Sequence, residues 1–213
     1  MVVRDDGWNG YNVLHDSASR VAALDIGFAP SAAARAAPVG SAEFVYLLGA
    51  DDYVATAVPE NAFVVYQGHH GDRGAARADV VLPGAAYTET SGTYVNLAGR
   101  VQRTRAAVPT VGDAREDWKI VRAVSEVLGA PLPYDDIDTL RRRMADIAPH
   151  LGTLSEVQAP VWMNGHFIRT LEGKAAAPGA LRSTIDSFFQ TDAISRASPT
   201  MAKCVVARQT MQF

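Results

Sequence analysis

The sequence predicts an α/β fold built on a mostly parallel sheet with flanking helices. Three short apolar runs, at residues 43–49, 63–68 and 79–84, are rich in branched and aromatic side chains, and each ends at a glycine. Such runs are typical of strands buried on both faces of a parallel sheet. Roughly a dozen residues connect one run to the next, which indicates crossover units rather than hairpins.

The weaker elements follow from shorter patterns. Tyr11, Leu14, Ala18 and Val21 recur at helical spacing, and Gly27 is placed to end that helix in a left-handed conformation. Residues 29–41 mix alanine with two prolines and predict a short helix or a covering loop. Residues 92–96 and 100–109 are further strand candidates, and the second carries enough charge to lie at an edge or on the surface.

Two longer helices are predicted in the second half of the chain. Residues 113–131 begin with Asp113 and Glu116, spaced as in a capping box, and end at Gly129 and Pro131. The apolar stripe of this helix is Trp118, Val121, Val124 and Leu128. A further helix is predicted to start at Asp135, with the stripe Ile137, Leu140, Met144 and Ile147 before Pro149.

We expect two parts in the chain. Residues 1–150 carry the elements above and form the α/β domain. Residues 151–213 form a loop-rich C-terminal region, because residues 151–181 lack periodicity and contain glycine, proline and a run of alanine. The tail after residue 181 regains aromatic residues and polar caps and is expected to dock back on the domain.

Composition restricts the functional classes. The 213 residues are 48% hydrophobic and 20% charged, with a net charge of −3 and a pI near 5.9, so neither nucleic acid nor an anionic membrane surface is an expected partner. The apolar runs are shorter than the ~20 residues that span a bilayer. The N-terminus has no apolar core for a secretory signal and few arginines for a transit peptide, although a presequence removed earlier would leave no trace.

Cys204 is the single cysteine, which excludes an internal disulfide framework, suggests a reducing compartment and excludes a multi-cysteine cluster within this chain.

A group of polar residues follows the second apolar run. His69, His70 and Asp72 lie where α/β folds place ligand sites. Adjacent histidines seldom bind one metal, so a loop pair with structural hydrogen bonds is favoured over a ligand pair. Asp51 follows the first run. Its carboxylate either accepts hydrogen bonds from a ribose or a guanine, or it caps the N-terminus of a helix, and we favour the cap.

The remaining candidates favour structural roles. No G-x-G-x-x-G motif and no Walker lysine is present, and Ser91, Ser195 and Ser198 lack the G-x-S-x-G setting of a nucleophile. Cys204 is either a redox thiol activated by Lys203 or a plain half-buried thiol, which its apolar neighbours favour. Three consecutive arginines, residues 141–143, spread around their helix and predict a solvated face rather than a binding patch.

The loop at residues 78–100 has a composition typical of loops that bind phosphates or dinucleotides in other folds. Its text, ADVVLPGAAYTETSGTYVNLAGR, resembles a pattern of molybdopterin-dependent oxidoreductases, whose α/β domain lies beside a guanine dinucleotide cofactor. A closer resemblance, collinear over nearly the whole chain apart from residues 151–181, is to the C-terminal part of the large iron–sulfur subunit of respiratory complex I. The segments that carry it are HDSASRVAALDIGF, LLGADD, YQGHHGDRGAARADVVLPGAAYTE, AREDWKIVRAVSE, LPYDDID and FFQTDAISRASPTMAKC.

The resemblance implies a partial molybdopterin-oxidoreductase-like domain that holds no molybdenum cofactor. It implies no catalytic, cofactor-binding or metal-binding residue in this chain, with the iron–sulfur clusters and FMN in other chains of the complex. The sequence departs from the family at Leu97 and Ala98, where a Glu usually precedes the Gly-Arg pair. Four polar residues of the loop are therefore expected to fix its backbone: Glu89, Thr93, Asn96 and Arg100.

The implied function is structural, within the peripheral arm of NADH:ubiquinone oxidoreductase. The expected partners are other peripheral-arm subunits, above all a chain carrying the ferredoxin-like iron–sulfur N-terminal half, with no nucleic acid and no direct membrane insertion. The expected location is the matrix side of the mitochondrial inner membrane, or alternatively the cytoplasmic face of a bacterial membrane. Two rival functions remain, the C-terminal part of a molybdenum oxidoreductase such as a formate dehydrogenase, and a free-standing nucleotide-binding module.

Overall fold

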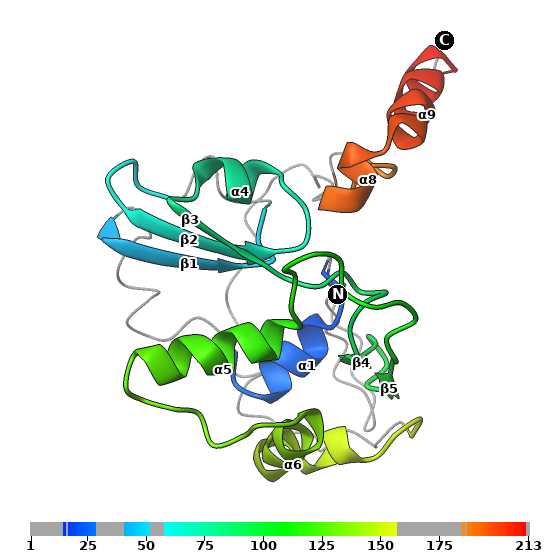
Figure 1. The fold of residues 1–213 in the computed structure, drawn as a ribbon. Helices are drawn as coiled ribbons and strands as arrows, with labels where there is room; N and C mark the ends of the chain where they lie inside the picture. The colour runs from blue at the N-terminus through cyan, green and yellow to red at the C-terminus, as the bar shows by residue number, and fades with distance from the viewer. Residues whose placement is uncertain are drawn as a thin grey trace, which may run out of the picture.

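A three-stranded parallel sheet organises the first half of the protein (Figure 1). The computed structural model describes residues 15, 17–28, 41–51, 58–156, 185 and 187–211. The sheet has the order β1-β2-β3, with β1 at Phe44–Leu48, β2 at Phe63–Gly68 and β3 at Val80–Pro83. Each predicted apolar run is one of these strands, and both pairings are parallel, so the α/β class with a parallel sheet is confirmed.

Helices lie on both sides of this sheet. Figure 1 shows α4, at Arg73–Arg77, above the sheet and α5, at Asp117–Val127, below it. The helix α4 forms the crossover between β2 and β3, as the spacing of the apolar runs predicts. The flanking helices are therefore also confirmed.

The prediction that all three strands are buried on both faces is correct only for the central one. In β2, Val64, Tyr66 and Gln67 are at most 2% exposed. In β1 and β3, by contrast, Phe44 is 59% exposed and Val81 is 51% exposed. Among the described residues β1 and β3 are the outer strands of the sheet, where fewer neighbouring side chains pack against each face.

A second, smaller core lies beneath the sheet. The strands β4 (Thr93–Val95) and β5 (Val101–Arg103) form an antiparallel pair, so the two weaker strand candidates are also confirmed. Their buried Val95 and Val101 pack with Ala148 and with Leu151, which is fully buried in the 3₁₀ helix η2. The predicted domain boundary at residue 150 therefore falls inside η2, which spans Pro149–Gly152.

The helix boundaries correct several capping predictions. The first helix, α1, spans Arg20–Asp25 and is followed by Gly27 at a φ of 84°, as predicted, while Tyr11 and Leu14 lie outside the described residues. The helix α5 begins only at Asp117, after Glu116, so the capping box with Asp113 is wrong. The carboxylate of Glu116 instead accepts a bond from the Ser91 amide and pairs with a lysine.

The helix α6 spans Ile137–Ile147, so it starts two residues after the predicted Asp135, and its cap is Asp136. The Asp136 carboxylate accepts from the amide of Thr139 at 2.7 Å. Of the predicted apolar stripes, Leu128 and Ile147 are 75% and 50% exposed, so the stripes of α5 and α6 are only partly covered.

The tail contains two helices, α8 at Ala193–Ala197 and α9 at Pro199–Thr210. Figure 1 shows α8 beside the upper part of the sheet and α9 projecting away from the body of the protein. Arg196 of α8 pairs with Asp72, which follows β2. Most of the predicted loop-rich segment, from residue 157 onward, lies outside the described residues. Within the described part, no helix is long and apolar enough to cross a membrane.

Candidate functional site

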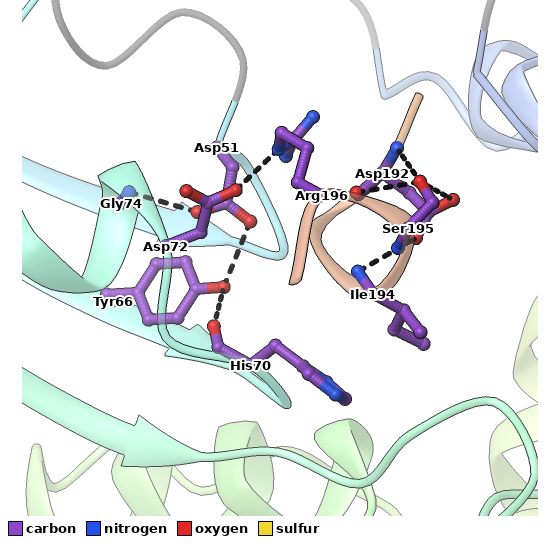
Figure 2. A network of polar contacts seen from close by, with 9 residues as sticks. All are labelled: Asp51, Tyr66, His70, Asp72, Gly74, Asp192, Ile194, Ser195 and Arg196. Carbon is purple, nitrogen blue, oxygen red and sulfur yellow. Dashed lines mark hydrogen bonds and ion pairs between the residues drawn. The ribbon is translucent and has the colours of Figure 1, made fainter. Parts of the chain in front are cut away.

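The candidate site lies at the carboxyl end of the parallel sheet. Asp51 follows β1, and His69, His70 and Asp72 follow β2, so the topology brings these four residues to one edge. This edge is where open α/β sheets bind ligands. Figure 2 shows what occupies it in this protein, namely a network of hydrogen bonds that joins the two strand ends to α4 and to α8.

Both carboxylate oxygens of Asp51 are engaged by protein donors. Asp51 is 6% exposed, its Oδ1 accepts from the amide of Gly74 at 2.9 Å, and its Oδ2 accepts from the Tyr66 hydroxyl at 3.2 Å. Gly74 is the second residue of α4, so Asp51 satisfies a free amide at the start of that helix. The N-cap position of α4 is Asp72, so Asp51 bonds to this helix from a distant strand end, and residues 52–57, which follow Asp51, lie outside the described residues.

The fit around Gly74 is close. A Cβ at this position would lie 2.7 Å from the Tyr66 ring and 2.8 Å from Asp51 Oδ1. Neither atom has room to move, because both Tyr66 and Asp51 are buried. Glycine at this position therefore allows α4 to approach the end of the sheet closely enough for its amide to reach Asp51.

Tyr66 stays neutral in this network. Its hydroxyl lies 3.2 Å from Asp51 Oδ2 and 3.1 Å from the carbonyl oxygen of His70, and its one proton is shared between these two acceptors. Burial, and next to it the negative charge of Asp51, raises the pKa of Tyr66 to about 12. A phenol with this pKa is a hydrogen-bond donor near neutral pH and not a base.

Asp72 joins the sheet edge to the tail. Its Oδ2 lies 2.5 Å from Nε of Arg196 on α8, and the two side chains are 22% and 20% exposed. Burial opposes the ionisation of Asp72, but the hydrogen bond and the charge of Arg196 outweigh burial and hold the Asp72 pKa below its ordinary value. Within α8, Asp192 and Ser195 form a capping box, which fixes the start of that helix. Asp72 thus serves to dock α8 (Figure 2).

The two histidines face each other rather than a common centre. The Nδ1 atoms of His69 and His70 are 2.7 Å apart, so one ring donates and the other accepts. Among the described residues, no group of three or more His, Cys, Asp or Glu side chains is placed to hold a metal ion. The arrangement fits the structural hydrogen bond that the sequence favours.

The three candidate serines make local hydrogen bonds, and the candidate cysteine is a free thiol. Ser198 accepts from the amide of Met201 at 3.4 Å and caps α9, and Ser91 Oγ accepts from the amide of Ala106 at 3.3 Å. Cys204 lies half-buried on α9 as a free thiol. Ser195 is committed to the capping box with Asp192.

The loop at residues 78–100 is fixed by its own side chains. Glu89 accepts from the amide of Ala86 at 3.1 Å, and Asn96 Oδ1 accepts from the amides of Ala98 and Arg100 at 3.0 and 2.9 Å. The Arg100 guanidinium donates to the carbonyl of Ser155, and Thr93 pairs with Arg103 in the β4–β5 ladder. Glu89 and Asn96 thus satisfy backbone amides of the loop as expected, whereas Arg100 bonds to a carbonyl outside the loop and Thr93 is placed by strand pairing.

Sequence reasoning missed one buried polar connection. Gln67 in β2 is fully buried, and its Nε2 donates to Asp117 Oδ1 at 2.8 Å, while its Oε1 accepts from the Tyr46 hydroxyl. This chain of bonds joins β1, β2 and the start of α5. The only available signal was a glutamine at the end of an otherwise apolar run, which needs a partner when buried.

Comparison with known proteins identifies matches to two family models. The family model of molybdopterin oxidoreductases matches residues 1–127, more than half of the chain. The chain belongs to the molybdopterin oxidoreductase family. A second family model, which describes the C-terminal region of an NADH-ubiquinone oxidoreductase subunit, matches residues 156–204. The predicted fold family and the predicted resemblance to complex I are both confirmed.

This molybdopterin oxidoreductase family member has close relatives among complex I proteins. It is 53% identical over 208 residues to the mitochondrial NADH-ubiquinone oxidoreductase 78 kDa subunit of Neurospora crassa, with 95% of this chain and 27% of the relative covered. It is 49% identical to the mitochondrial NADH dehydrogenase (ubiquinone) iron-sulfur protein 1 of Solanum tuberosum, with 95% and 27% covered. The NADH-ubiquinone oxidoreductase 75 kDa subunit of Reclinomonas americana is 43% identical, with 95% and 29% covered. The chain thus spans somewhat more than a quarter of the length of these relatives.

Proposed function

We propose that this chain is a structural part of the large iron–sulfur subunit in the peripheral arm of NADH:ubiquinone oxidoreductase, and that it carries no redox centre. The observation that carries the proposal is the 53% identity to a complex I subunit over 95% of the chain. Identity at this level over nearly the whole chain supports a shared assembly as well as a shared fold. The complex moves electrons from NADH to ubiquinone, and this part supports that transfer by holding its neighbours in place.

The geometry of the sheet edge supports a structural role. In open α/β folds, the carboxyl end of the sheet is the natural place for a ligand. Here Asp51 and Asp72 are engaged by an α4 amide and by Arg196, and Tyr66 remains protonated. A cofactor at this edge would have to displace bonds that fix α4 and α8. The polar residues of the edge therefore act as positioning residues for the fold.

The redox centres belong, in this proposal, to other chains. A single cysteine cannot supply the ~4 thiolates that an iron–sulfur cluster normally requires. We therefore assign the iron–sulfur clusters and FMN to partner chains, and none to this one. The rival function is the C-terminal part of a molybdenum oxidoreductase such as a formate dehydrogenase, which the family match to residues 1–127 alone would also fit.

The partner surface is apolar. A groove of about 590 Å³ lies between β3 and α5, lined by Leu82, Ile120, Val124, Val127 and Leu128 among others. Val127 and Leu128 in it are 88% and 75% exposed. Outer strands and apolar patches of this kind promote association. We propose that the chain carrying the ferredoxin-like N-terminal half covers this groove, in an interface on the order of 2,000 Å² or more.

We propose that the assembly lies at the matrix side of the mitochondrial inner membrane; two of the relatives above are named as mitochondrial, which supports the mitochondrion as the compartment. The cytoplasmic face of a bacterial membrane is the alternative. In either case this chain is expected to reach the membrane through its partners and not by its own insertion.

Affinity purification of a tagged copy of this chain from native membranes tests the proposal. We expect the tagged chain to migrate on blue native gels with NADH:ubiquinone reductase activity, and to bring down flavin and iron. A soluble, monomeric chain that is stably folded by itself would contradict the proposal. Molybdenum in stoichiometric amount would favour the rival function.

A further inference from the structure

Three arginine side chains line one small pocket between α6 and the β4–β5 hairpin. Arg103 comes from β5, and Arg141 and Arg142 come from α6. The cavity volume is about 320 Å³, and Asp138, Ala145 and Gly152 complete the lining. The solvated face predicted for residues 141–143 fits Arg142 and Arg143, which are exposed, whereas the Arg141 side chain is only 15% exposed.

The guanidinium groups of this arginine pocket have more donors than the described residues can satisfy. The Arg141 side chain is 15% exposed, and its Nε is buried with no hydrogen-bond partner in the described part of the chain. The nearest acid is Asp138, whose Oδ1 lies 3.7 Å from Arg141 Nη1 and whose side chain is 84% exposed. Arg142 donates to the Thr139 hydroxyl at 2.9 Å. The lining thus carries three positive charges and one exposed negative charge.

This arrangement of charges favours the binding of an anion. A buried donor left without an acceptor costs about 1–3 kcal/mol, and three positive charges around one pocket repel one another unless a negative charge lies near them. The planar guanidinium fork matches the oxygens of carboxylates and phosphates. A carboxylate offers two oxygens, whereas a phosphate offers at least three, one for each arginine.

We propose that the arginine pocket binds a phosphate group. Arg141 is the central ligand, since it lines the pocket and is the least exposed of the three arginines. Arg103 and Arg142 close the site from β5 and from the next position of α6. The group is either free inorganic phosphate or the phosphomonoester headgroup of a lipid, and the proposal does not depend on which complex contains the chain.

Site-resolved arginine modification tests this proposal in the assembled complex. Phenylglyoxal labels accessible guanidinium groups, and peptide mass spectrometry reads each arginine separately. Inorganic phosphate, compared with chloride at equal ionic strength, is expected to slow the labelling of Arg103 and Arg142. Arg143 is the matched control, because it is exposed on the same helix and is not among the described residues that line the pocket. Its labelling is expected to stay unchanged.

Variants separate a specific site from general screening. Arg141→Gln is expected to raise the phosphate concentration needed to protect Arg103 and Arg142 by roughly tenfold or more, whereas Arg143→Gln keeps the wild-type response. Where Arg141→Gln does not assemble, Arg103→Gln on the exposed hairpin edge replaces it, with Arg142 as the readout.

The outcomes are distinct. Protection by free phosphate and equally by vesicles containing phosphatidic acid, but not by phosphatidylcholine vesicles, identifies a lipid headgroup. Protection by free phosphate alone identifies a small anion. Equal protection of Arg143, absence of protection, or protection that persists in Arg141→Gln would overturn the proposal.

Discussion

The ion pair between Asp72 and Arg196 is expected to control the docking of the tail. Arg196→Gln removes the guanidinium and leaves a carboxylate whose side chain is only 22% exposed. Hydrogen bonds to charged groups contribute about 1.5–3 kcal/mol, so the docked state of α8 should lose a factor of roughly 10 to 150 in its equilibrium. Both side chains are largely shielded from solvent, so this ion pair should contribute more to stability than a fully exposed surface pair does.

Hydrogen exchange of the α8 peptide, measured by mass spectrometry in the assembled complex, reports this equilibrium. Exchange of α8 is expected to accelerate in Arg196→Gln, while Arg208→Gln on the projecting helix α9 leaves it unchanged. The pKa of Asp72 is lowered, so its contribution is fully present above the ordinary Asp pKa of about 3.9 and disappears only as the pH falls through the lower folded value. The difference between variant and wild type should therefore be equal at pH 7 and pH 5. Unchanged exchange of α8 in Arg196→Gln would refute the reasoning.

Three further variants and one pH series test the rest of the fold. Gln67→Met removes the bonds to Tyr46 and Asp117 and should lower the free energy of unfolding by about 2–4 kcal/mol, whereas the exposed Gln102→Met should change it little, as read by thermal unfolding of the complex. Asn96→Ala should cost only about 1 kcal/mol, because the side chain is exposed, and should reduce assembly on native gels before the electron-transfer rate per complex. Cys204→Ser should leave every iron–sulfur EPR signal of the complex unchanged; loss of one signal would assign this thiol to a cluster. Since burial and Asp51 raise the pKa of Tyr66 to about 12, the stability that it contributes should be present below pH 10 and fall from pH 10 to 12, a loss that Tyr66→Phe should abolish.

The sequence was most informative where one local pattern determines one element. Apolar runs bounded by glycine placed β1, β2 and β3, and the left-handed Gly27 ended α1 where predicted. Capping was less predictable, because an acid near a helix start has more than one available partner. Glu116 binds the Ser91 amide and Lys119, and Asp51 bonds to an α4 amide from the end of another strand.

Contacts between distant segments could not be predicted from spacing. Asp72 and Arg196 are separated by 124 positions, and nothing in either local sequence identifies the other as its partner. The same holds for Gln67 and Asp117, which lie 50 positions apart. The convergence of Arg103 with Arg141 likewise depends on how the hairpin packs beside α6. Topology therefore predicts which residues lie at the carboxyl end of the sheet, whereas their hydrogen-bond partners depend on long-range contacts.

The central claim is that this chain supports complex I without holding a redox centre of its own. The most direct measurement is metal, flavin and EPR analysis of the complex purified through a tag on this chain, followed by separation of the chain and repeated analysis of the isolated fraction. The account predicts NADH:ubiquinone reductase activity, iron and FMN in the complex, no molybdenum, and no bound metal in the fraction that contains this chain. Molybdenum in the complex, or a cluster that stays with this chain, would contradict it.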